Sequence, residues 1–343
     1  MSMKRSLRNA ASKVYRSFGV QRFRGLVGGL FDRREPLYDL VVVVSPGYRG
    51  WIIEGIANEI ARHFPGKCCI HYSLTSLPAA KAYFFAHYMM LVGAYRYNPV
   101  MWRKKVFAWY THPHLDLDPD SERQFFYVLN ELGLIFCASQ LSADYLHSKG
   151  VPAARTASVL GGADPALFLP HSRGSGKIGF CSAYYERKAP EKIVEIVKRM
   201  PHRAFLLVGR RWDRYERFAE LRALPNFEYV DADYADYPAL YAQMDVFVST
   251  STLEGGPIPL IEAMMCNAVP VASRTGFAPE VIRHGENGFL FETDAAVDVI
   301  CGLIEQAATL EGDIRATVLH CSWRAFSAQV AALMGFGARG SRP

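Results

Sequence analysis

The sequence predicts an α/β protein with two doubly wound domains, and three observations support this prediction. Short apolar runs typical of buried parallel strands alternate with amphipathic segments of helical length over most of the 343 residues. A stretch rich in glycine and proline, GGADPALFLPHSRGSGK at 161–177, interrupts the alternation as a crossover between domains would. The length suits two domains of ordinary size. We expect domains at 37–165 and 166–320, preceded by an arm at 1–36 and followed by a C-terminal helix and tail at 321–343 that could cross back to the first domain.

The first domain opens with a continuous apolar run, LVVVV at 40–44, which predicts a buried strand. The turn SPGYRG at 45–50 leads from this strand into a helix. The further predicted elements are a helix WIIEGIANEIARHF (51–64), a strand CCIHYS (68–73), a helix LPAAKAYFFAHYMMLVGAY (77–95), strands KVFAWY (105–110) and LGLIFCAS (132–139), and a helix LSADYLHSKG (141–150).

The second domain resumes the alternation after the crossover. Its predicted strands are KIGFCS (177–182), AFLLVG (204–209), FEYVD (227–231), VFVST (246–250) and VPVAS (269–273). Its predicted helices are PEKIVEIVKRM (190–200), WDRYERFAELRAL (212–224), YPALYAQM (237–244), PLIEAMMC (259–266) and PEVIRHG (279–285). Strands that alternate with helices in this way predict a parallel sheet.

The segment STLEGGPIPLIEAM at 251–264 follows a predicted strand end, which is where open α/β sheets bind ligands. Pro259 suits the first position of a helix, because its missing N–H would have no helical partner there. The amides of Leu260 and Ile261 would then be free at a helix start, which favours a phosphate. Glu262 lies one turn further in, where it could reach hydroxyl groups of the molecule that carries the phosphate. Glu254 precedes the helix.

Two longer stretches resemble the signature of a known enzyme family. EGGPIPLIEAMMCNAVPVAS and GFAPEVIRHGENGFLF resemble the E-x7-E region of the family 4 retaining glycosyltransferases, and VLGGADPALFLP at 159–170 resembles the interdomain segment of that family. The resemblance covers most of residues 155–295. It implies the GT-B fold, in which two Rossmann-like domains face each other across a cleft that holds a nucleotide-sugar.

The resemblance also implies roles for individual residues. Glu262 would bind the ribose hydroxyls, and Glu254 would contact the donor sugar near its reacting carbon. The sugar hydroxyls and the diphosphate would be held by Gly255, Gly256 and the amides of Leu260 and Ile261.

Cations of the family lie on the loop after the first strand of the second domain. Lys188 matches the family's lysine, which neutralises the departing diphosphate. Ala183 stands where the family has arginine, and Arg187 could replace it from next to Lys188. Pro257 stands where the family commonly has glycine, so one amide donor is missing there. We therefore expect phosphate contacts that differ in detail from those of the family.

Three further residues are candidates at the donor site. Gly47, in the turn after the first strand, would let the backbone approach a diphosphate or sugar, although a plain strand-to-helix turn is the alternative. His112 follows the strand at 105–110, where family members often use a histidine to touch the donor sugar. His114 and a solvated loop histidine are the alternatives. Arg210 follows the strand at 204–209 and could reach phosphate or remain a surface charge.

The sequence contains no convincing metal or cofactor motif. DLDPD at 116–120 fails as a calcium loop, because Ser121 and Tyr127 stand where glycine and glutamate are needed. Acidic capping of the following helix explains it better. No Gly-x-Gly-x-x-Gly occurs, which counts against a nicotinamide or flavin enzyme. The seven scattered cysteines favour free thiols in a reducing cytoplasm.

The positive charge of the chain is concentrated in its first 36 residues. They hold nine basic and two acidic residues, a net charge of +7, whereas the whole chain carries +6. Apolar residues recur there at helical spacing, among them Phe23, Leu26 and Val27. A basic amphipathic helix could bind an anionic membrane surface, and packing on the protein itself is the alternative. Nucleic acid is not expected as a partner, and no apolar run is long enough for a transmembrane helix.

These observations predict a cytoplasmic retaining glycosyltransferase, which could be peripheral on the inner face of the plasma membrane. It would move a sugar from a nucleotide diphosphate-sugar to a glycan acceptor, which could be lipid-linked, in polysaccharide or glycolipid biosynthesis. Neither a metal nor another cofactor is expected. A nucleotide-sugar epimerase or hydrolase of the same fold is one alternative, and would turn over without an acceptor. A degenerate, non-catalytic binding protein is the other.

Overall fold

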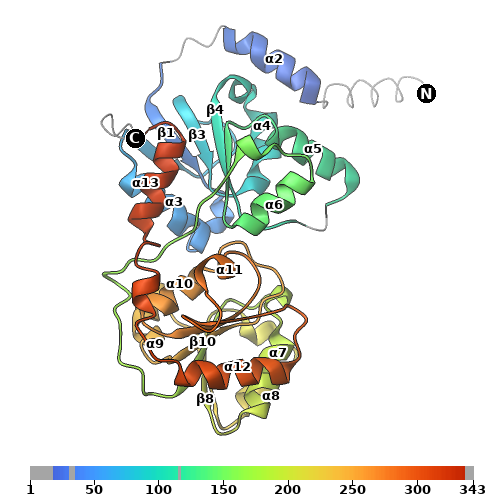
Figure 1. Cartoon of the computed structure of the whole chain (residues 1–343). Helices are drawn as coiled ribbons and strands as arrows, with labels where there is room; N and C mark the ends of the chain where they lie inside the picture. The colour runs from blue at the N-terminus through green and yellow to red at the C-terminus, as the bar shows by residue number, and fades with distance from the viewer. Residues whose placement is uncertain (1–17, 31–34, 115–116, 337–343) are drawn as a thin grey trace, which may run out of the picture. The chain divides into compact units, whose positions relative to one another are not determined.

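The computed structural model describes residues 18–30, 35–114 and 117–336, which form two compact units (Figure 1). Unit 1 comprises Met1–Cys137, Ala143–Val159 and Ser327–Pro343, and unit 2 comprises Ala138–Ser142 and Leu160–Phe326. Each unit holds a parallel sheet of six strands with helices packed against it. The predicted α/β class with two doubly wound units is confirmed.

The sheet of unit 1 has the strand order β2-β1-β3-β4-β5-β6. The strands are β1 Tyr38–Val43, β2 Cys68–His71, β3 Ala80–Phe85, β4 Lys105–Tyr110, β5 Leu134–Cys137 and β6 Thr156–Ser158. The order reverses at β1 and β3, which pair in parallel with Val43 opposite Phe85. A reversal of this kind is a topological switch point, so the loops that follow β1 and β3 are the place where such a sheet binds ligands.

Helices cover both faces of this sheet. They are α3 Ile52–His63, α4 Leu91–Tyr97, α5 Pro119–Leu129, α6 Gln140–Ser148 and the end of α13 Trp323–Leu333. One core joins α4, α5 and α6 to the side chains of Val41, Val43 and Phe85. Figure 1 shows α3 and α13 together on the other side of the strands.

The prediction of a single helix at 77–95 is wrong. The structure has strand β3, a 3₁₀ turn η2 Tyr88–Met90 and helix α4 in that stretch. Ala82, Tyr83, Phe84 and Phe85 are all buried, because β3 lies between β1 and β4 with both faces covered. Apart from the exposed Lys81, the strand is apolar on both faces, and such a pattern cannot be told from that of a buried helix.

The sheet of unit 2 has the strand order β12-β11-β10-β7-β8-β9. The strands are β7 Lys177–Cys181, β8 Ala204–Val208, β9 Phe227–Val230, β10 Val246–Ser249, β11 Val269–Ser273 and β12 Phe289–Phe291. The first strand of the unit, β7, pairs with both β8 and β10. This is the order of a dinucleotide-binding Rossmann sheet, whose ligand crevice lies at the carboxyl ends of the two strands that correspond to β7 and β10.

The helices of unit 2 follow its strands in turn. They are α7 Pro190–Arg199, α8 Phe218–Arg222, α9 Tyr237–Tyr241, α10 Ile258–Met265, α11 Ala278–Val281 and α12 Val297–Thr309. The sequence does not predict helix α12 or the three-residue edge strands β6 and β12. The predicted helix at 212–224 is broken into a 3₁₀ turn, η6 Trp212–Arg214, and the short α8.

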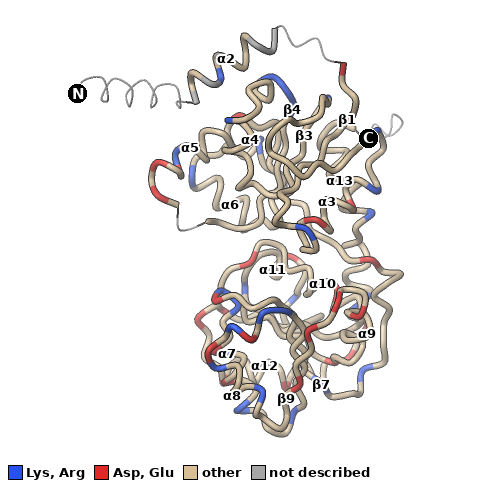
Figure 2. The backbone as a smooth tube through the Cα atoms, turned by 180° about the vertical axis from the view of Figure 1, so that it is seen from behind, with Lys and Arg blue, Asp and Glu red and all other residues tan. Residues whose placement is uncertain are grey.

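The charged outer surface of α7 and α8 is paired internally. Figure 2 shows acidic and basic positions close together over these helices. Arg217 contacts Glu191 at 2.6 Å, Glu195 at 3.1 Å and Glu220 at 2.6 Å. These charges therefore form a surface network and are not an open anion-binding patch.

Only part of the basic arm lies within the described residues. Helix α2, Phe18–Leu30, packs on the 3₁₀ turn η3 Pro99–Arg103, because Gly25 lets the two backbones touch: a Cβ at Gly25 would lie 2.2 Å from the oxygen of Pro99. Phe23, Leu26 and Val27 are exposed on this helix. The expectations for residues 1–17 and 31–34 lie outside the described residues. Across the described part of the chain, no helix combines the length and the apolar character needed to cross a membrane.

Candidate active site in unit 2

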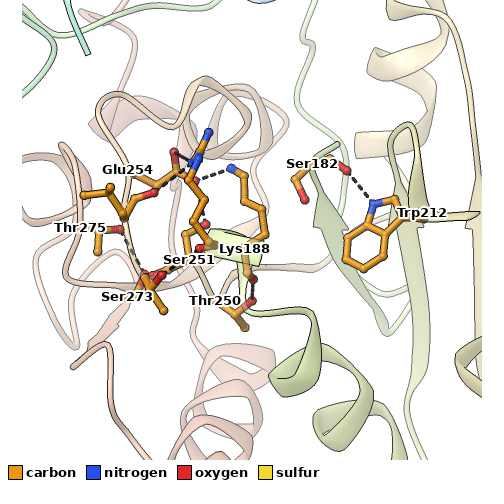
Figure 3. Close-up of polar contacts among 11 residues, drawn as sticks. Ser182, Lys188, Trp212, Thr250, Ser251, Glu254, Ser273 and Thr275 are labelled. Carbon is orange, nitrogen blue, oxygen red and sulfur yellow. Dashed lines mark hydrogen bonds and ion pairs between the residues drawn. The ribbon is translucent and has the colours of Figure 1, made fainter. Parts of the chain in front are cut away.

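The loops after β7 and β10 meet at the switch point of unit 2 and bring three predicted residues together. Glu254 follows β10, and Lys188 and Arg187 lie in the 3₁₀ turn η5 Glu186–Lys188 that follows β7. The Lys188 ammonium bonds Oε1 of Glu254, and Arg187 donates to Oε2 at 3.0 Å. Figure 3 shows Lys188 and Glu254 pointing toward each other. Arg187, which stands next to the family's lysine position, thus reaches the same carboxylate as Lys188.

Serine hydroxyl groups also hold Glu254 in place through hydrogen bonds. Ser251 donates to Oε1 of Glu254 at 2.7 Å, and Ser273 donates to the carbonyl of Ser251 at 2.6 Å (Figure 3). Burial alone would raise the pKa of the Glu254 carboxyl, but Lys188 and Arg187 outweigh it and lower this pKa to about 2. Glu254 is therefore a buried carboxylate that stays ionised.

Hydrogen bonds to backbone carbonyl groups fix the two loops to each other. Thr250 donates from its hydroxyl to the carbonyl of Lys188 at 2.7 Å, and the amide of Thr252 donates to the carbonyl of Arg187 at 2.8 Å. The cations consequently keep their positions relative to Glu254 without relying on the ion pairs alone.

The start of α10 differs in detail from the prediction. The helix spans Ile258–Met265, so Pro259 is its second residue and Pro257 is the N-cap. The amide of Leu260 is not free as expected, because it donates to the carbonyl of Pro257 at 2.9 Å. Asn267, which follows the helix, adopts the left-handed conformation with φ of 73°. A phosphate contact through Ile261 stays a prediction.

The two glycines between Glu254 and α10 lie in tight surroundings. A Cβ at Gly256 would come 2.9 Å from the ring of Phe277, and a Cβ at Gly276 would come 2.5 Å from the carbonyl oxygen of Gly255. Larger residues at 256 or 276 would push the loop that carries Glu254. A direct ligand contact of Gly255 and Gly256 stays a prediction.

Glu262 is buried on α10 and is bonded by two tyrosines that sequence reasoning did not place there. Tyr234 donates to Oε1 at 2.5 Å and Tyr241 donates to Oε2 at 2.9 Å. Burial raises the pKa of Glu262 to about 7, although both hydrogen bonds act in the opposite direction. No spacing in the sequence could have revealed these partners, since Tyr234 and Tyr241 come from the turn after β9 and from α9.

Arg210 lies in unit 2 but has other partners. It follows β8 and pairs with Asp233 at 3.4 Å and Asp231 at 4.0 Å. Its side chain is 42% exposed. The structure therefore does not bring Arg210 to the Glu254 carboxylate, and its binding of a phosphate stays a prediction.

The candidates of unit 1 lie at the carboxyl edge of its own sheet. Gly47 is in the 3₁₀ turn η1 Pro46–Tyr48 after β1, with open space where a side chain would be. His112 follows β4, and its carbonyl accepts the hydroxyl of Tyr88 at 2.7 Å. A joint role of these residues with Glu254 stays a prediction.

His87 is a titratable residue at this edge that the sequence prediction misses, because it falls in the wrongly predicted helix. Burial, together with the nearby His112 and His114, lowers the pKa of His87 to about 4. Its Nδ1 accepts the amide of Met89 at 3.3 Å, so the neutral ring carries its proton on Nε2.

The acidic stretch at 116–120 behaves as the capping prediction requires. Asp118 is the N-cap of α5 and accepts the amides of Asp120 and Ser121, both at 3.1 Å. Asp116 lies outside the described residues. Within residues 18–30, 35–114 and 117–336, no three His, Cys, Asp or Glu side chains are grouped so that they could hold a metal ion.

The part of the chain that holds this site matches a known family model, and a short stretch of the chain matches a known protein. The family model described as "Glycosyl transferases group 1" matches residues 169–316, a range that includes Lys188, Glu254 and Glu262. Over 74 residues the chain is 36% identical to N-acetyl-alpha-D-glucosaminyl L-malate synthase of Bacillus anthracis; the match covers 22% of this chain and 18% of that protein.

Two solved structures share the fold of nearly the whole chain. The Anabaena protein Alr3699/HepE, in complex with UDP-glucose, has a TM-score of 0.69 at 18% identity and covers 87% of this chain and 99% of its own. Sucrose-phosphate synthase of Thermosynechococcus elongatus has a TM-score of 0.70 at 16% identity and covers 88% of this chain and 98% of its own. These likenesses show the fold: two Rossmann-like units of the GT-B class, as the sequence predicts.

Proposed function

We propose that this chain is a glycosyltransferase that moves a sugar from a nucleoside diphosphate-sugar to a glycan acceptor. The observation that supports this most directly is the meeting of Lys188, Arg187 and Glu254 at the switch point of unit 2, inside the stretch that matches the glycosyltransferase model. Two cations at a strand end are suited to a diphosphate.

The cations give the site its chemistry. When the bond between sugar and phosphate breaks, negative charge grows on the departing diphosphate, and a fixed ammonium and guanidinium lower the free energy of that transition state. Lys188 and Arg187 neutralise Glu254, and they would direct part of their hydrogen bonding to the diphosphate when it binds. Because these residues supply the positive charge, the proposal requires no metal ion.

The proposal includes retention of the anomeric configuration, with Glu254 and Glu262 as the two acids of an E-x7-E signature. Both oxygens of Glu254 are already bonded to Lys188, Arg187 and Ser251, which makes the carboxylate a poor nucleophile. We therefore assign Glu254 the role of positioning the donor sugar. The leaving phosphate would then accept the proton of the acceptor hydroxyl on the same face.

Uridine nucleotides are the first donors to test, because Alr3699/HepE is described in complex with UDP and with UDP-glucose. A thermal-shift screen of UDP-, GDP- and ADP-sugars identifies the donor, since a ligand that binds only the folded state raises the melting temperature. The Lys188→Met variant should then lose about 10²–10³ in kcat.

The products of this reaction separate the proposal from its alternatives. Turnover of the donor with no acceptor present would indicate an epimerase or hydrolase. A donor that binds and is never transferred, with equal cellular function for Glu254→Gln and the unaltered chain, would indicate a non-catalytic binding protein. Full transfer by Lys188→Met would contradict the mechanism.

We extend the proposal to a lipid-linked acceptor and to binding of an anionic membrane surface through residues 1–36. On α2, Phe23 is 69% exposed and Leu26 and Val27 are about equally exposed at 41% and 40%, beside a segment with a net charge of +7. Apolar side chains next to basic ones suit the boundary between lipid headgroups and acyl chains.

Flotation with liposomes that contain anionic lipid tests this extension. The full chain should float, whereas a chain without residues 1–36 and the triple variant F23S/L26S/V27S should float much less. The variant V299S/L319S removes two exposed apolar side chains from unit 2 and serves as the control. Equal flotation of all four proteins would remove the membrane proposal and leave the transferase proposal intact.

A further inference from the structure

Both carboxylate oxygens of Glu262 accept a hydrogen bond from a tyrosine. Only 2% of this residue is exposed, and each of its two oxygens accepts one tyrosine hydroxyl, at 2.5 Å from Tyr234 and at 2.9 Å from Tyr241. A carboxylate buried without donors would cost a large desolvation free energy, so these hydroxyls stabilise the buried Glu262. A ribose hydroxyl that binds Glu262 must therefore share or replace one of them.

The two tyrosines differ in their freedom to move. Tyr241 lies in helix α9 with 1% of its surface exposed, and its ring packs on those of Phe168 at 5.7 Å and Phe247 at 6.1 Å. Tyr234 lies in a three-residue 3₁₀ turn, η7 Tyr234–Asp236, and is 44% exposed. Its ring contacts those of Phe168 and Tyr237 at centroid distances of 6.1 and 5.3 Å. Tyr234 is therefore already partly in solvent and can turn further outward, whereas rotation of Tyr241 would open the core.

We propose that the Tyr234 hydroxyl is an exchangeable placeholder that leaves Oε1 of Glu262 when a ribose hydroxyl of the donor arrives. Tyr241 stays bonded to Oε2 throughout and holds the carboxylate in place. This inference rests on the proposed function, and it assigns to Tyr234 a role in selectivity for ribose that follows from its position over Glu262.

The placeholder has a consequence that can be measured. A nucleotide without ribose hydroxyls leaves Tyr234 in place, so Glu262 stays bonded and the missing hydroxyls cost little affinity. Without the tyrosine hydroxyl, only a ribose hydroxyl can satisfy Oε1. In Tyr234→Phe, the preference for UDP over 2′,3′-dideoxyuridine 5′-diphosphate should then grow. The reason is that the ribose hydroxyl now adds a hydrogen bond to Glu262 and no longer replaces the one from Tyr234.

Calorimetric titration of the full-length chain with these two nucleotides tests the inference. The ratio of their dissociation constants should be small in the unaltered chain and should widen about tenfold or more in Tyr234→Phe. Tyr234→Phe should also bind UDP more tightly than the unaltered chain, since no hydroxyl has to be displaced. An unchanged ratio would show that Tyr234 and ribose act independently, and a narrower ratio would show that the hydroxyl contacts ribose directly. Either result overturns the inference.

Tyr241→Phe is the matched control, because it removes the other hydroxyl from the same carboxylate. Its ratio should stay near that of the unaltered chain, and an equal widening would mean that loss of any donor to Glu262 suffices. Circular dichroism melting of each variant shows that it is folded.

Glu262→Gln separates this inference from the proposed function. If it leaves the affinity for UDP unchanged, Glu262 is not the ribose site and the donor assignment fails. If it weakens UDP binding and the Tyr234→Phe ratio does not widen, only the placeholder is overturned. If no nucleoside diphosphate binds the unaltered chain, both proposals are wrong.

Discussion

Glu254 and Glu262 are both buried, yet their carboxyl groups have opposite acidities. Burial disfavours the charged form of each, but only Glu254 has cations beside it, from Lys188 and Arg187. Its pKa is about 2, whereas the pKa of Glu262, bonded only by neutral tyrosines, is about 7. The same side chain on the same segment therefore serves as a fixed charge in one position and as a titrating group in the other.

This difference predicts the pH dependence of stability in Glu262→Gln. Because the pKa of Glu262 is raised in the folded state, its contribution is fully present below about pH 4.5 and is lost as the pH rises through about 7. Glutamine does not titrate, so the free energy of unfolding of the unaltered chain should fall relative to Glu262→Gln by about 3 kcal/mol at most between pH 5 and 8. Urea unfolding at four pH values measures this.

Glu254→Gln is the control for that experiment. The pKa of Glu254 is lowered in the folded state, so its contribution is present above about pH 4.5 and is lost only as the pH falls toward 2. Its free-energy difference from the unaltered chain should therefore be constant between pH 5 and 8. A Glu262→Gln difference that is equally constant would mean that Glu262 is ionised throughout this range.

Lys188→Met should destabilise unit 2 through the carboxylate that it leaves behind. The side chain of Lys188 is 15% exposed and that of Glu254 is 7% exposed, so the pair is shielded from water. Removal of one partner of a buried pair costs about 3 kcal/mol or more in the free energy of unfolding. The double variant with Glu254→Gln should cost clearly less than the sum of the two single variants, because the charge that needs neutralising is gone. Additive values in urea unfolding would contradict the coupling.

At the scale of elements, the pairing of β7 with β10 determines which residues meet at the candidate site. These strands pair in parallel, Ile178 opposite Val246, so the loop of Lys188 and the loop of Glu254 start side by side. The alternation of strands and helices predicts the parallel sheet but not which strands are neighbours. The pairing of β7 with β10 brings together Lys188 and Glu254, which are 66 positions apart in the chain.

Sequence reasoning misses strands β3, β6 and β12 for two different physical reasons. Strand β3 is apolar on both faces and therefore lacks the period of two that marks a half-buried strand. The edge strands β6 and β12 have three residues each, too few for any period. In the candidate site, the family resemblance points to Lys188, Glu254 and Glu262, and the structure shows that Lys188 contacts Glu254. The resemblance does not find Tyr241, whose contact with Glu262 depends on the packing of α9.

Gly209→Ala tests the link between β8 and the loop of Lys188. Gly209 has φ of 149°, and a Cβ there would lie 1.9 Å from the carbonyl oxygen of Ser182, just after β7. That oxygen also accepts the indole N–H of Trp212 at 2.8 Å (Figure 3). We expect a loss of about 1–3 kcal/mol in the free energy of unfolding, measured by urea titration, from strained backbone alone.

Gly302→Ala is the matched control for this substitution. Gly302 lies inside helix α12, and a Cβ there would meet nothing within 4 Å. Alanine should leave the chain unchanged or stabilise it by about 0.4–1 kcal/mol. Equal free energies of unfolding for Gly209→Ala and Gly302→Ala would show that the Ser182 carbonyl moves away at no cost in stability.

At the scale of the whole molecule, the C-terminal helix α13 is divided between the two units. Its residues up to Phe326 belong to unit 2, and Ser327 onward belongs to unit 1. Ser327 donates from its hydroxyl to the carbonyl of Glu59 in α3 at 3.0 Å. Phe336 meets the ring of Phe64 edge-on at 5.0 Å. The last described residues of the chain thus pack on α3 and the residue that follows it, in unit 1.

Removal of residues 327–343 should therefore unfold unit 1 preferentially. Val330 and Met334 are buried in unit 1, and their burial alone contributes about 3–6 kcal/mol, a large part of the stability of an ordinary domain. Calorimetry should show one transition moved to a much lower temperature, and mass spectrometry after limited proteolysis should place the new cleavage sites in unit 1. A chain that lacks only 337–343 keeps Val330, Met334 and Phe336 and should melt like the full chain. If the longer deletion instead lowers the stability of unit 2, the packing of α13 on α3 contributes little to unit 1.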